Sequence, residues 1–274
     1  MCKNITNQEK GLVGLNKKQT AQITVSLVSH GHHEMVQNLI EDLNRCREVS
    51  HIFLTQNIRE PQVACCSRKV KIRVNAQPRG YGENHNTAFR KVSTPYFCVL
   101  NPDLGIPNNP FPVLIQALED RRLGVCAPRI LAPKGTKEDS HRLFPGLADI
   151  LLKAFGRYQG KVPTKGAKEW EQKSWLAGMF LFFRSEVFDQ LGGFDESFFL
   201  YYEDVDICAR LIARGYRVRL VKSTSIIHDA RRRSRRDLQH AGWHLKSMAR
   251  YFWKKWTGAY RSSSLAHPKS LPVS

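Results

Sequence analysis

The sequence has little of what membrane-spanning or disulfide-stabilised proteins need. Its longest near-continuous apolar run, residues 175–183, is less than half of the roughly 20 residues that cross a bilayer. The seven cysteines are an odd number, Cys65 and Cys66 are adjacent, and no C-x-x-C pair occurs. A full disulfide framework and a paired-cysteine metal site are therefore both excluded, which favours a reducing, cytoplasmic location.

Acidic residues are also scarce relative to basic ones. The 43 Lys and Arg against 24 Asp and Glu give a formal net charge of +19, which attracts anionic partners over long distances. Nucleic acid, an anionic membrane surface and phosphorylated small molecules all fit. The polar residues 1–21 lack the apolar core of a signal peptide and are expected to be a disordered leader, and the 42% of hydrophobic residues suffice for one main domain over residues 22–230.

Alternating strand and helix patterns predict an α/β fold with a Rossmann-like, mostly parallel central sheet flanked by helices. Residues 23–28 are β-rich and apolar, residues 33–45 have a helical apolar face, and further strands are expected at 51–55 and 70–74. Ligands of such sheets bind beyond the carboxyl ends of the strands. Site residues are therefore expected in the turns that follow the strands.

Later patterns extend this prediction but loosen in the middle of the chain. Residues 131–171 carry scattered Pro, Gly and Lys and suggest a substrate-binding excursion, where we expect acceptor recognition. The remaining regular patterns predict helices at 86–91, 111–120 and 184–191 and strands at 124–129, 175–183, 216–221 and 225–228.

Two polar loops have the residues that a phosphorylated ligand requires. Residues 79–86 combine two glycines, which let the backbone approach a ligand, with arginine and asparagine donors, although a lone motif of this kind is more often only a turn. The apolar strand 95–100 ends in Asn101-Pro102-Asp103, which places a carboxylate at the sheet edge. Asp103 is available there to a divalent cation, or it forms an Asx turn.

The most acidic stretch follows a run of five large apolar residues, 198–202. Glu203, Asp204 and Asp206 lie within four positions at the expected start of a helix, where carboxylates interact favourably with the helix dipole. An acidic helix N-terminus is the plainer interpretation of the segment alone. Asp206 and Arg210, four residues apart, are expected to pair.

The ordered set of motifs resembles family 2 glycosyltransferases over roughly residues 22–230. The tail, residues 243–252, further resembles the rhamnosyltransferase-like members that build bacterial surface polysaccharides. The motifs that carry the resemblance are Arg79–Gly82, Leu100–Asp103, Gly192–Glu196, Phe199–Asp206, Arg214–Val218 and Ile227–His228.

The resemblance implies a GT-A fold and an inverting transfer from a nucleotide-diphosphate sugar with Mg²⁺ or Mn²⁺. Asp103 matches the family's metal-binding aspartate, and His228 matches a histidine that completes the metal or diphosphate site. Asp204 matches the catalytic base, which takes a proton from the acceptor hydroxyl. Glu203 beside it is expected to raise the pKa of Asp204 by like-charge repulsion or to orient it.

Donor recognition is expected at the strand ends and in the two polar loops. Many relatives have a nucleobase-binding aspartate after the second strand, where this chain has Thr55-Gln56-Asn57. Gln56 can still accept from a pyrimidine N3–H, so a dTDP- or UDP-linked sugar remains the expected donor. The donor-binding residues are predicted to be Ser29, His30, Gln56, Arg79, Gly80, Tyr81, Gly82, Asn86, Asn101 and Asp103, with Trp175, Gly178, Arg232 and Arg233 as acceptor- or phosphate-binding candidates.

The basic carboxyl-terminal part leaves alternatives open. The five arginines of residues 231–236 either clamp phosphates or form a solvated basic face. Residues 238–256 form the amphipathic part of an extension over 231–256, which either lies on an anionic membrane surface or packs its apolar stripe against the domain. Residues 257–274 are expected to be a disordered tail.

The sequence therefore predicts a glycosyltransferase that moves a sugar, rhamnose among the candidates, to a saccharide or lipid-linked acceptor in cell-surface polysaccharide synthesis. We expect it in the cytoplasm, on the inner face of the cytoplasmic membrane. A basic nucleic-acid-binding protein and a catalytically inactive scaffold are the alternatives, and the motif set makes a nucleic acid partner the weaker prediction.

Overall fold

The computed structural model describes residues 22–61, 67–146, 149, 162, 170–229 and 238–261. The predicted leader, the arginine run with Arg232 and Arg233, and the tail beyond residue 261 lie outside the described residues. The elements are β1 (Ile23–Ser29), α1 (His33–Arg45), β2 (Val49–Gln56), β3 (Val70–Val74), α2 (Tyr81–Phe89), β4 (Tyr96–Leu100), β5 (Leu104–Gly105), α3 (Phe111–Ala117), β6 (Leu123–Leu131), β7 (His141–Leu143), β8 (Ser174–Leu176), β9 (Phe180–Arg184), α6 (Ser185–Gln190), α7 (Glu203–Ala213), β10 (Arg217–His228) and α8 (Leu238–Trp256).

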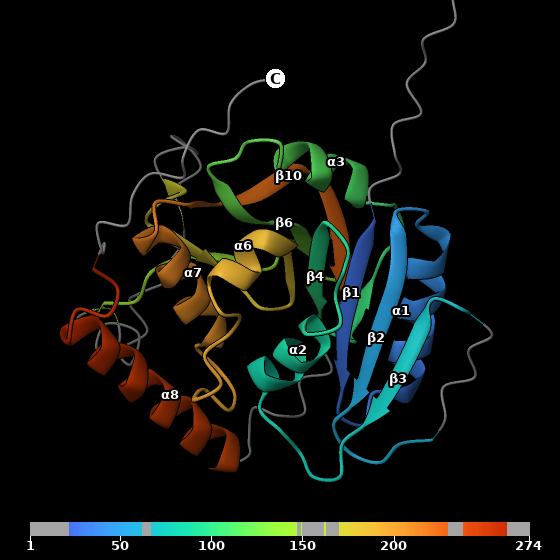
Figure 1. The fold of residues 1–274 in the computed structure, drawn as a ribbon, viewed down its shortest axis with the longest axis horizontal. Helices are drawn as coiled ribbons and strands as arrows, with labels where there is room; N and C mark the ends of the chain where they lie inside the picture. The colour runs from blue at the N-terminus through green and yellow to red at the C-terminus, as the bar shows by residue number, and fades with distance from the viewer. Residues whose placement is uncertain are drawn as a thin grey trace, which may run out of the picture.

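A single eight-stranded sheet organises the molecule, in the order β3-β2-β1-β4-β9-β6-β10-β5 (Figure 1). Strands β3, β2, β1 and β4 are parallel, as are β6 and β10, whereas β9 and β5 run antiparallel to their neighbours. The predicted α/β fold with a mostly parallel sheet is confirmed. Because β1, β2 and β4 point the same way, their carboxyl ends share one edge, where Ser29 pairs with Gln56.

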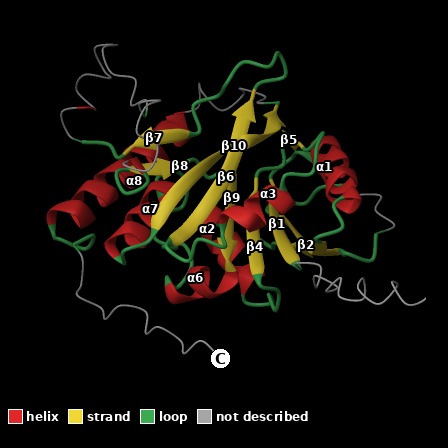
Figure 2. Ribbon diagram, turned by 90° about the horizontal axis from the view of Figure 1, so that it is seen from above, coloured by secondary structure: helices red, strands yellow, loops and turns green. Residues whose placement is uncertain are grey.

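The core lies between the sheet and the helices that cover both its faces (Figure 2). All seven residues of β1 are buried, as expected of a central parallel strand. Helix α1 buries its apolar face on the sheet, and each fully buried Leu or Ile contributes about 1.5–3 kcal/mol. The buried residues of α1 are Met35, Val36, Leu39, Ile40 and Leu43.

Two element predictions around the polar loops are wrong in detail. Helix α2 begins at Tyr81, five residues before the predicted start, because Gly80 already adopts the extended N-cap conformation. Residues 175–183 form two strands rather than one. β8 pairs with β7 in a separate two-stranded sheet, and β9 joins the main sheet after a break at residues 177–179.

The carboxyl-terminal strand prediction also needs correction. The two strands expected at 216–221 and 225–228 are one strand, β10, whose pairing with β6 is irregular between Val221 and Ser225. The irregularity interrupts the alternation of apolar and polar residues along β10, and the sequence pattern therefore predicted two strands instead of one.

Helix α8 lies beside α7 in both views (Figures 1 and 2). Tyr251 of α8 packs with Phe198 and Val205 in a small second cluster. No helix within the described ranges is both long and apolar enough to cross a membrane.

Candidate active site

Asp103 and His228 meet at the carboxyl edge of the sheet although they are 125 residues apart. Asp103 follows β4, and His228 ends β10, which pairs with β5 so that His228 lies opposite Leu104. The Nε2 of His228 is 3.1 Å from Oδ2 of Asp103. The ring's other nitrogen, Nδ1, is 2.5 Å from Oε2 of Glu138.

The two carboxylates determine the charge of His228. Burial alone would lower the pKa of His228, but hydrogen bonds to Asp103 and Glu138 and their negative charges outweigh it and raise that pKa to about 9. The imidazole is therefore cationic at neutral pH in this arrangement. Sequence reasoning did not identify Glu138, because it lies in the loosely patterned middle of the chain.

The donor set suits a cation that takes only part of its coordination from the protein. In the described part of the chain no group of three or more His, Cys, Asp or Glu residues could hold a metal ion by itself. Asp103 and Glu138 bind opposite nitrogens of the ring, so they do not converge on one point. Oδ1 of Asp103 is buried without a hydrogen-bond partner among the described residues, as a metal-binding oxygen would be. Mg²⁺ commonly uses one or two protein carboxylates with substrate phosphates, and this arrangement fits that requirement.

Asp204 lies at the start of α7 and is fixed by two backbone donors. The N–H of Gly178, in the break between β8 and β9, donates to Oδ2 at 2.9 Å, and the N–H of Val205 donates to Oδ1 at 2.8 Å. Burial raises the pKa of Asp204, and these hydrogen bonds together with the charge of Arg142 partly oppose the rise. The carboxylate is therefore oriented and more basic than an exposed aspartate.

Glu203 is in a different electrostatic state from its neighbour. It is buried, and its Oε2 has no hydrogen-bond partner among the described residues. Burial, followed by the charge of Asp204, raises the pKa of Glu203 well above its usual value. That Glu203 raises the pKa of Asp204 or orients it stays a prediction. A neutral Glu203 leaves Asp204 as the charged member of the pair.

Tyr201 and Tyr202, which precede α7, adopt left-handed backbone conformations with φ of 70° and 66°. Such conformations cost about 1–3 kcal/mol each for non-glycine residues, so the surroundings must enforce them. The hydroxyl of Tyr201 lies 2.9 Å from Nδ1 of His240, and the ring of Tyr202 packs on Tyr251, both on α8. Helix α8 thus supports the corner from which Asp204 projects.

Tyr81 joins the two halves of the site. Its hydroxyl lies 3.0 Å from Oδ1 of Asn101, in the loop that carries Asp103. The same hydroxyl lies 2.8 Å from the carbonyl oxygen of Gly178, whose N–H binds Asp204. One side chain therefore links the Asp103 loop to the Asp204 corner.

The predicted donor residues of β1 and β2 lie together at the sheet edge. The hydroxyl of Ser29 donates to Oε2 of Glu60 at 2.8 Å, and the amide of Gln56, which is buried, donates to the carbonyl of Pro61 at 3.3 Å. His30 is exposed beside them. Glu60, which the sequence patterns did not indicate, thus places a carboxylate at this edge.

The Arg79–Gly80 turn is held by asparagine side chains. Oδ1 of Asn57 accepts from the Arg79 N–H at 2.8 Å, and its Nδ2 donates to the Arg79 carbonyl at 3.0 Å. The guanidinium of Arg79 extends to Glu83, 2.9 Å away, and remains 44% exposed. A Cβ at Gly80 would lie 3.1 Å from the carbonyl oxygen of Phe199, so the glycine lets this turn pack against the segment before α7.

Gly82 and Asn86 have packing roles in α2. A Cβ at Gly82 would lie 2.7 Å from Cβ of Phe194, so the absence of a side chain serves helix packing. The amide of Asn86 donates to the Phe194 carbonyl and accepts from the Phe194 N–H, both at 2.8 Å. These contacts explain both residues without a ligand.

Arg142 is a further residue that sequence reasoning missed. It lies on β7 opposite Trp175 of β8, with its Cζ 5.8 Å from the centre of the Trp175 ring. The indole N–H of Trp175 donates to the Leu143 carbonyl at 3.1 Å. Nε of Arg142 lies 3.0 Å from Asp139 but lacks hydrogen-bond geometry, and the side chain is 38% exposed. Its positive charge also lowers the pKa of Asp204, so Arg142 lies within electrostatic range of the candidate base.

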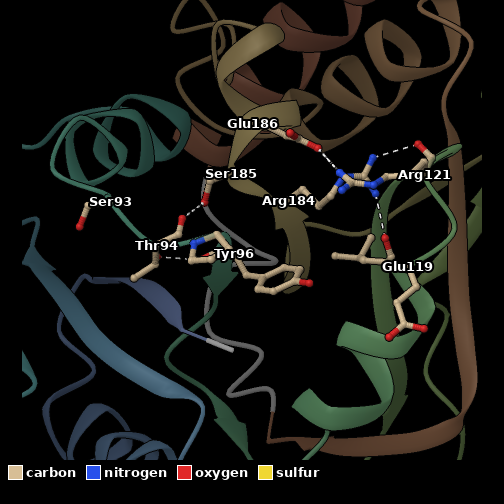
Figure 3. A pocket seen from close by; sticks show the side chains of 10 residues that line it. Ser93, Thr94, Tyr96, Glu119, Arg121, Arg184, Ser185 and Glu186 are labelled. Carbon is tan, nitrogen blue, oxygen red and sulfur yellow. Dashed lines mark hydrogen bonds and ion pairs between the residues drawn. The ribbon is translucent and has the colours of Figure 1, made fainter. Parts of the chain in front are cut away.

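A separate pocket lies at the other end of β4 (Figure 3). Thr94, Tyr96 and Arg184 line it, and the guanidinium of Arg184 already donates to the carbonyls of Leu118 and Arg121 at 2.9 and 3.0 Å. The length of β4 separates this pocket from the Asp103 loop by about 17 Å. It is therefore distinct from the candidate active site.

Solved structures with the same architecture are glycosyltransferases. The mannosyltransferase PcManGT from Pyrobaculum calidifontis, in complex with GDP-Man and Mn²⁺, matches with a TM-score of 0.59 and 14% identity over 85% of this chain and 64% of that one. GalNAc-T7 with UDP, GalNAc and Mn²⁺ matches with a TM-score of 0.61 and 14% identity over 87% of this chain and 49% of that one. The chain has the GT-A fold of these glycosyltransferases.

Sequence comparison identifies the family within that class. The model of glycosyl transferase family 2 matches residues 55–192, and that of glycosyl transferase family group 2 matches residues 170–268. The rhamnosyltransferase WbbL of Escherichia coli K12 is 30% identical over 90% of this chain and 100% of its own length. The N-acetylglucosaminyl-diphospho-decaprenol L-rhamnosyltransferase of Mycobacterium tuberculosis is 30% identical over 60% of this chain, which spans 57% of that relative. The chain belongs to glycosyltransferase family 2, as a rhamnosyltransferase-like member.

Proposed function

We propose that this chain is an inverting, metal-dependent transferase that moves rhamnose or a related sugar from a dTDP- or UDP-linked donor to a saccharide or lipid-linked acceptor. The observation that best supports this is the Tyr81 hydroxyl, which links the Asp103 loop to the backbone carbonyl beside Asp204. A substrate bound between Asp103 and Asp204 would then contact both a group that binds the diphosphate and a group that accepts a proton.

The chemistry assigned to this region is a single displacement. Asp204 takes the proton from the acceptor hydroxyl as its oxygen forms a bond to the anomeric carbon and the bond to the diphosphate breaks. The hydrogen bonds from Gly178 and Val205 hold the carboxylate in place for this transfer. When bound at Asp103 and at His228 in its deprotonated form, Mg²⁺ or Mn²⁺ would supply positive charge for the departing diphosphate. Neutral Glu203 keeps a second negative charge away from the reacting centre.

The donor nucleotide is assigned to the edge formed by β1, β2 and the following turns. Ser29, His30, Gln56 and the Arg79–Gly80 turn lie there, with Asn101 towards Asp103. Gln56 is the residue proposed to select a pyrimidine. The nucleotides in the two solved neighbours, GDP-Man and UDP, support a nucleotide-diphosphate sugar as the donor class.

The acceptor is assigned to the β7–β8 side of Asp204. Trp175 offers an aromatic face for a sugar ring, and Arg142 offers a cation for a phosphate of the acceptor. The mycobacterial relative, an N-acetylglucosaminyl-diphospho-decaprenol L-rhamnosyltransferase, supports a lipid-linked acceptor. In this proposal residues 22–230 are the catalytic domain, residues 231–256 are an extension, and the protein works in polysaccharide synthesis on the inner face of the cytoplasmic membrane.

Thermal unfolding of the purified full chain with dTDP- and UDP-sugars, with and without Mg²⁺ or Mn²⁺, tests donor and metal together. A ligand at 100 times its Kd adds about 2.7 kcal/mol to the free energy of unfolding, which raises Tm by several degrees. We expect one donor to give such a shift only with metal, and Asp103→Asn to lose it. Shifts with oligonucleotides and none with any nucleotide sugar would instead identify a nucleic-acid-binding protein. Donor binding without transfer to any acceptor would favour the inactive scaffold.

A further inference from the structure

Helix α8 is attached to the domain through both apolar and polar contacts, the apolar ones centred on Tyr251, which packs with Phe198 and Val205. Its buried residues are Ser247 and Tyr251. The hydroxyl of Ser247 donates to the Leu200 carbonyl at 2.8 Å, and the ammonium of Lys254 lies 2.8 Å from Oδ2 of Asp195 and also pairs with Asp206. Hydrogen bonds, ion pairs and the packing of Tyr251 therefore hold the inward face of α8.

The apolar stripe of the same helix faces solvent. The exposed fractions are 90% for Leu238, 61% for Leu245, 60% for Trp253 and 82% for Trp256. At 100° per residue these four side chains lie within a sector of about 80°, opposite Ser247. A surface helix that only packs on its own domain has the reverse arrangement. Of the predicted stripe, Leu238, Leu245 and Trp256 therefore face solvent, whereas Phe252 packs against the cluster of Phe198 and Val205.

The charge around α8 indicates what would cover the stripe. The sequence of α8 contains no acidic residue, and Lys246 and Lys255 lie to either side of the stripe. Five arginines lie in residues 231–236, directly before the helix. Two α8 helices facing each other across a dimer would bring these like charges together, whereas an anionic lipid surface attracts them.

We propose that α8 docks the protein on an anionic lipid bilayer, with Leu238, Leu245, Trp253 and Trp256 at the boundary between headgroups and acyl chains. An apolar stripe combined with the basic residues Lys246 and Lys255 beside it supplies the two signals that stable membrane attachment requires. The docking rests on α8 alone, and only its use for a lipid-linked acceptor rests on the proposed function.

The placement of α8 would bring the bilayer close to the candidate base. The inner face of α8 contacts Tyr201 and Tyr202, the two residues before Glu203 and Asp204. A helix with its side chains is about 10–12 Å across, so a surface bound to its outer face lies on the order of 10 Å from that corner. A diphosphate headgroup anchored in the bilayer would reach Arg142 and Asp204 over such a distance.

Sedimentation of the full chain with lipid vesicles tests this docking directly. We expect binding to vesicles of phosphatidylglycerol and phosphatidylcholine, weak binding to phosphatidylcholine alone, and a blue shift of tryptophan emission on binding. The double substitution Leu245→Ser/Trp256→Ser should lower the partition coefficient about tenfold or more, because the apolar contribution is lost. Part of the wild-type binding should persist in about 0.5 M salt, where charge attraction is largely screened.

A matched control removes exposed apolar residues elsewhere on the surface. Ile72 and Val74, on the edge strand β3, are 46% and 52% exposed, so Ile72→Thr/Val74→Thr should leave vesicle binding unchanged. Circular dichroism melts of both variants verify that they remain folded. Absence of wild-type binding, an equal loss in the control, or a wild-type dimer that Leu245→Ser/Trp256→Ser dissociates would each overturn the proposal. None of these outcomes affects the donor-dependent thermal shift, so the proposed function is tested separately.

Discussion

Two adjacent carboxyl groups in this chain acquire different properties from their surroundings. Asp204 receives backbone N–H groups on both oxygens, whereas Oε2 of Glu203 receives none from the described residues. Hydrogen bonds stabilise the charged form of a carboxyl group, and burial without them stabilises the neutral form. The pair therefore separates into a charged, oriented group and a neutral one, which is the arrangement that a site with one general base requires.

Replacement of Asp204 by Asn should remove transfer while preserving the site. The amide is nearly isosteric but cannot accept the proton, so kcat should fall by about 10²–10⁴. Donor binding, measured by the metal-dependent thermal shift, should remain near that of the wild type. An Asp204→Asn variant with wild-type kcat would contradict the assignment of the base.

The pH profile gives an independent check on the same residue. Activity requires ionised Asp204, whose pKa is raised by burial, so kcat/KM should fall as pH decreases through a value above the ordinary aspartate pKa of about 3.9. The residual activity of Asp204→Asn should lack this limb. A profile that is identical in both proteins would assign the limb to another group.

Glu203→Gln should stabilise the protein at neutral and alkaline pH. The folded-state pKa of Glu203 is raised, so the folded state favours its protonated form, and stability present below the unfolded-state pKa is lost as pH rises through the folded-state pKa. The glutamine cannot ionise and avoids that loss. The Tm of Glu203→Gln should exceed that of the wild type by a few degrees at pH 8 and by less at pH 4. A larger difference at pH 4 would show that Glu203 is charged in the folded state.

At the scale of elements, the packing of α8 on α7 determines how the catalytic corner is held. Lys254 pairs with Asp195 and with Asp206, which is fully buried, and Asp206 also accepts from Arg210 at 2.7 Å and from the Tyr260 hydroxyl at 2.7 Å. Without the two basic partners the buried carboxylate would carry an uncompensated charge. This network fastens α8 to the helix whose first turn carries Asp204.

Lys254→Met should therefore destabilise the protein by about 3 kcal/mol, since it removes one partner of a buried ion pair. Lys255→Met is the matched control, because the ammonium of Lys255 contacts the Pro145 carbonyl at 3.2 Å and the rings of Tyr251 and Phe252, and no carboxylate among the described residues. Urea unfolding of the two variants measures the difference. Equal stabilities would mean that the Lys254 network contributes nothing to the attachment of α8.

Local sequence patterns predicted the helices and strands that bury a continuous apolar face. They missed the strands that form only by pairing with a segment far away in the sequence. The alternation of β1, α1 and β2 and the Asp206–Arg210 pair were visible in the sequence, and the structure confirms them. The β7–β8 pair joins segments more than 30 residues apart, and neither strand exceeds three residues. No periodicity marks strands so short, and for that reason Arg142 and the break at Gly178 could not be placed from sequence.

At the scale of the whole molecule, long-range pairing brings the site residues together at one edge of the sheet. Asp103 follows β4, His228 ends β10, and Asp204 begins α7, and the chain between them forms the sheet's far strands and the β7–β8 pair. The motif order in the sequence indicates which residues belong to the site, but their distances depend on the antiparallel strands β9 and β5, which the alternation of strands and helices did not predict.

The carboxyl-terminal extension is also packed against the catalytic domain. The cluster of Phe198, Val205 and Tyr251 and the Lys254 network connect α8 to the catalytic domain. Truncation after Asp229 would expose Phe198 and Val205 and leave Asp206 without Lys254 and Tyr260. We expect the truncated chain to aggregate or to lose well over 3 kcal/mol of stability, judged by chemical unfolding and size-exclusion chromatography.

Hydrogen exchange on the intact protein supplies the second readout, in which amides near Tyr251 should open together with those of α7. A truncated chain with the wild-type Tm, or α8 amides that exchange far faster than those of α7, would instead define residues 22–230 as a domain that folds without the helix.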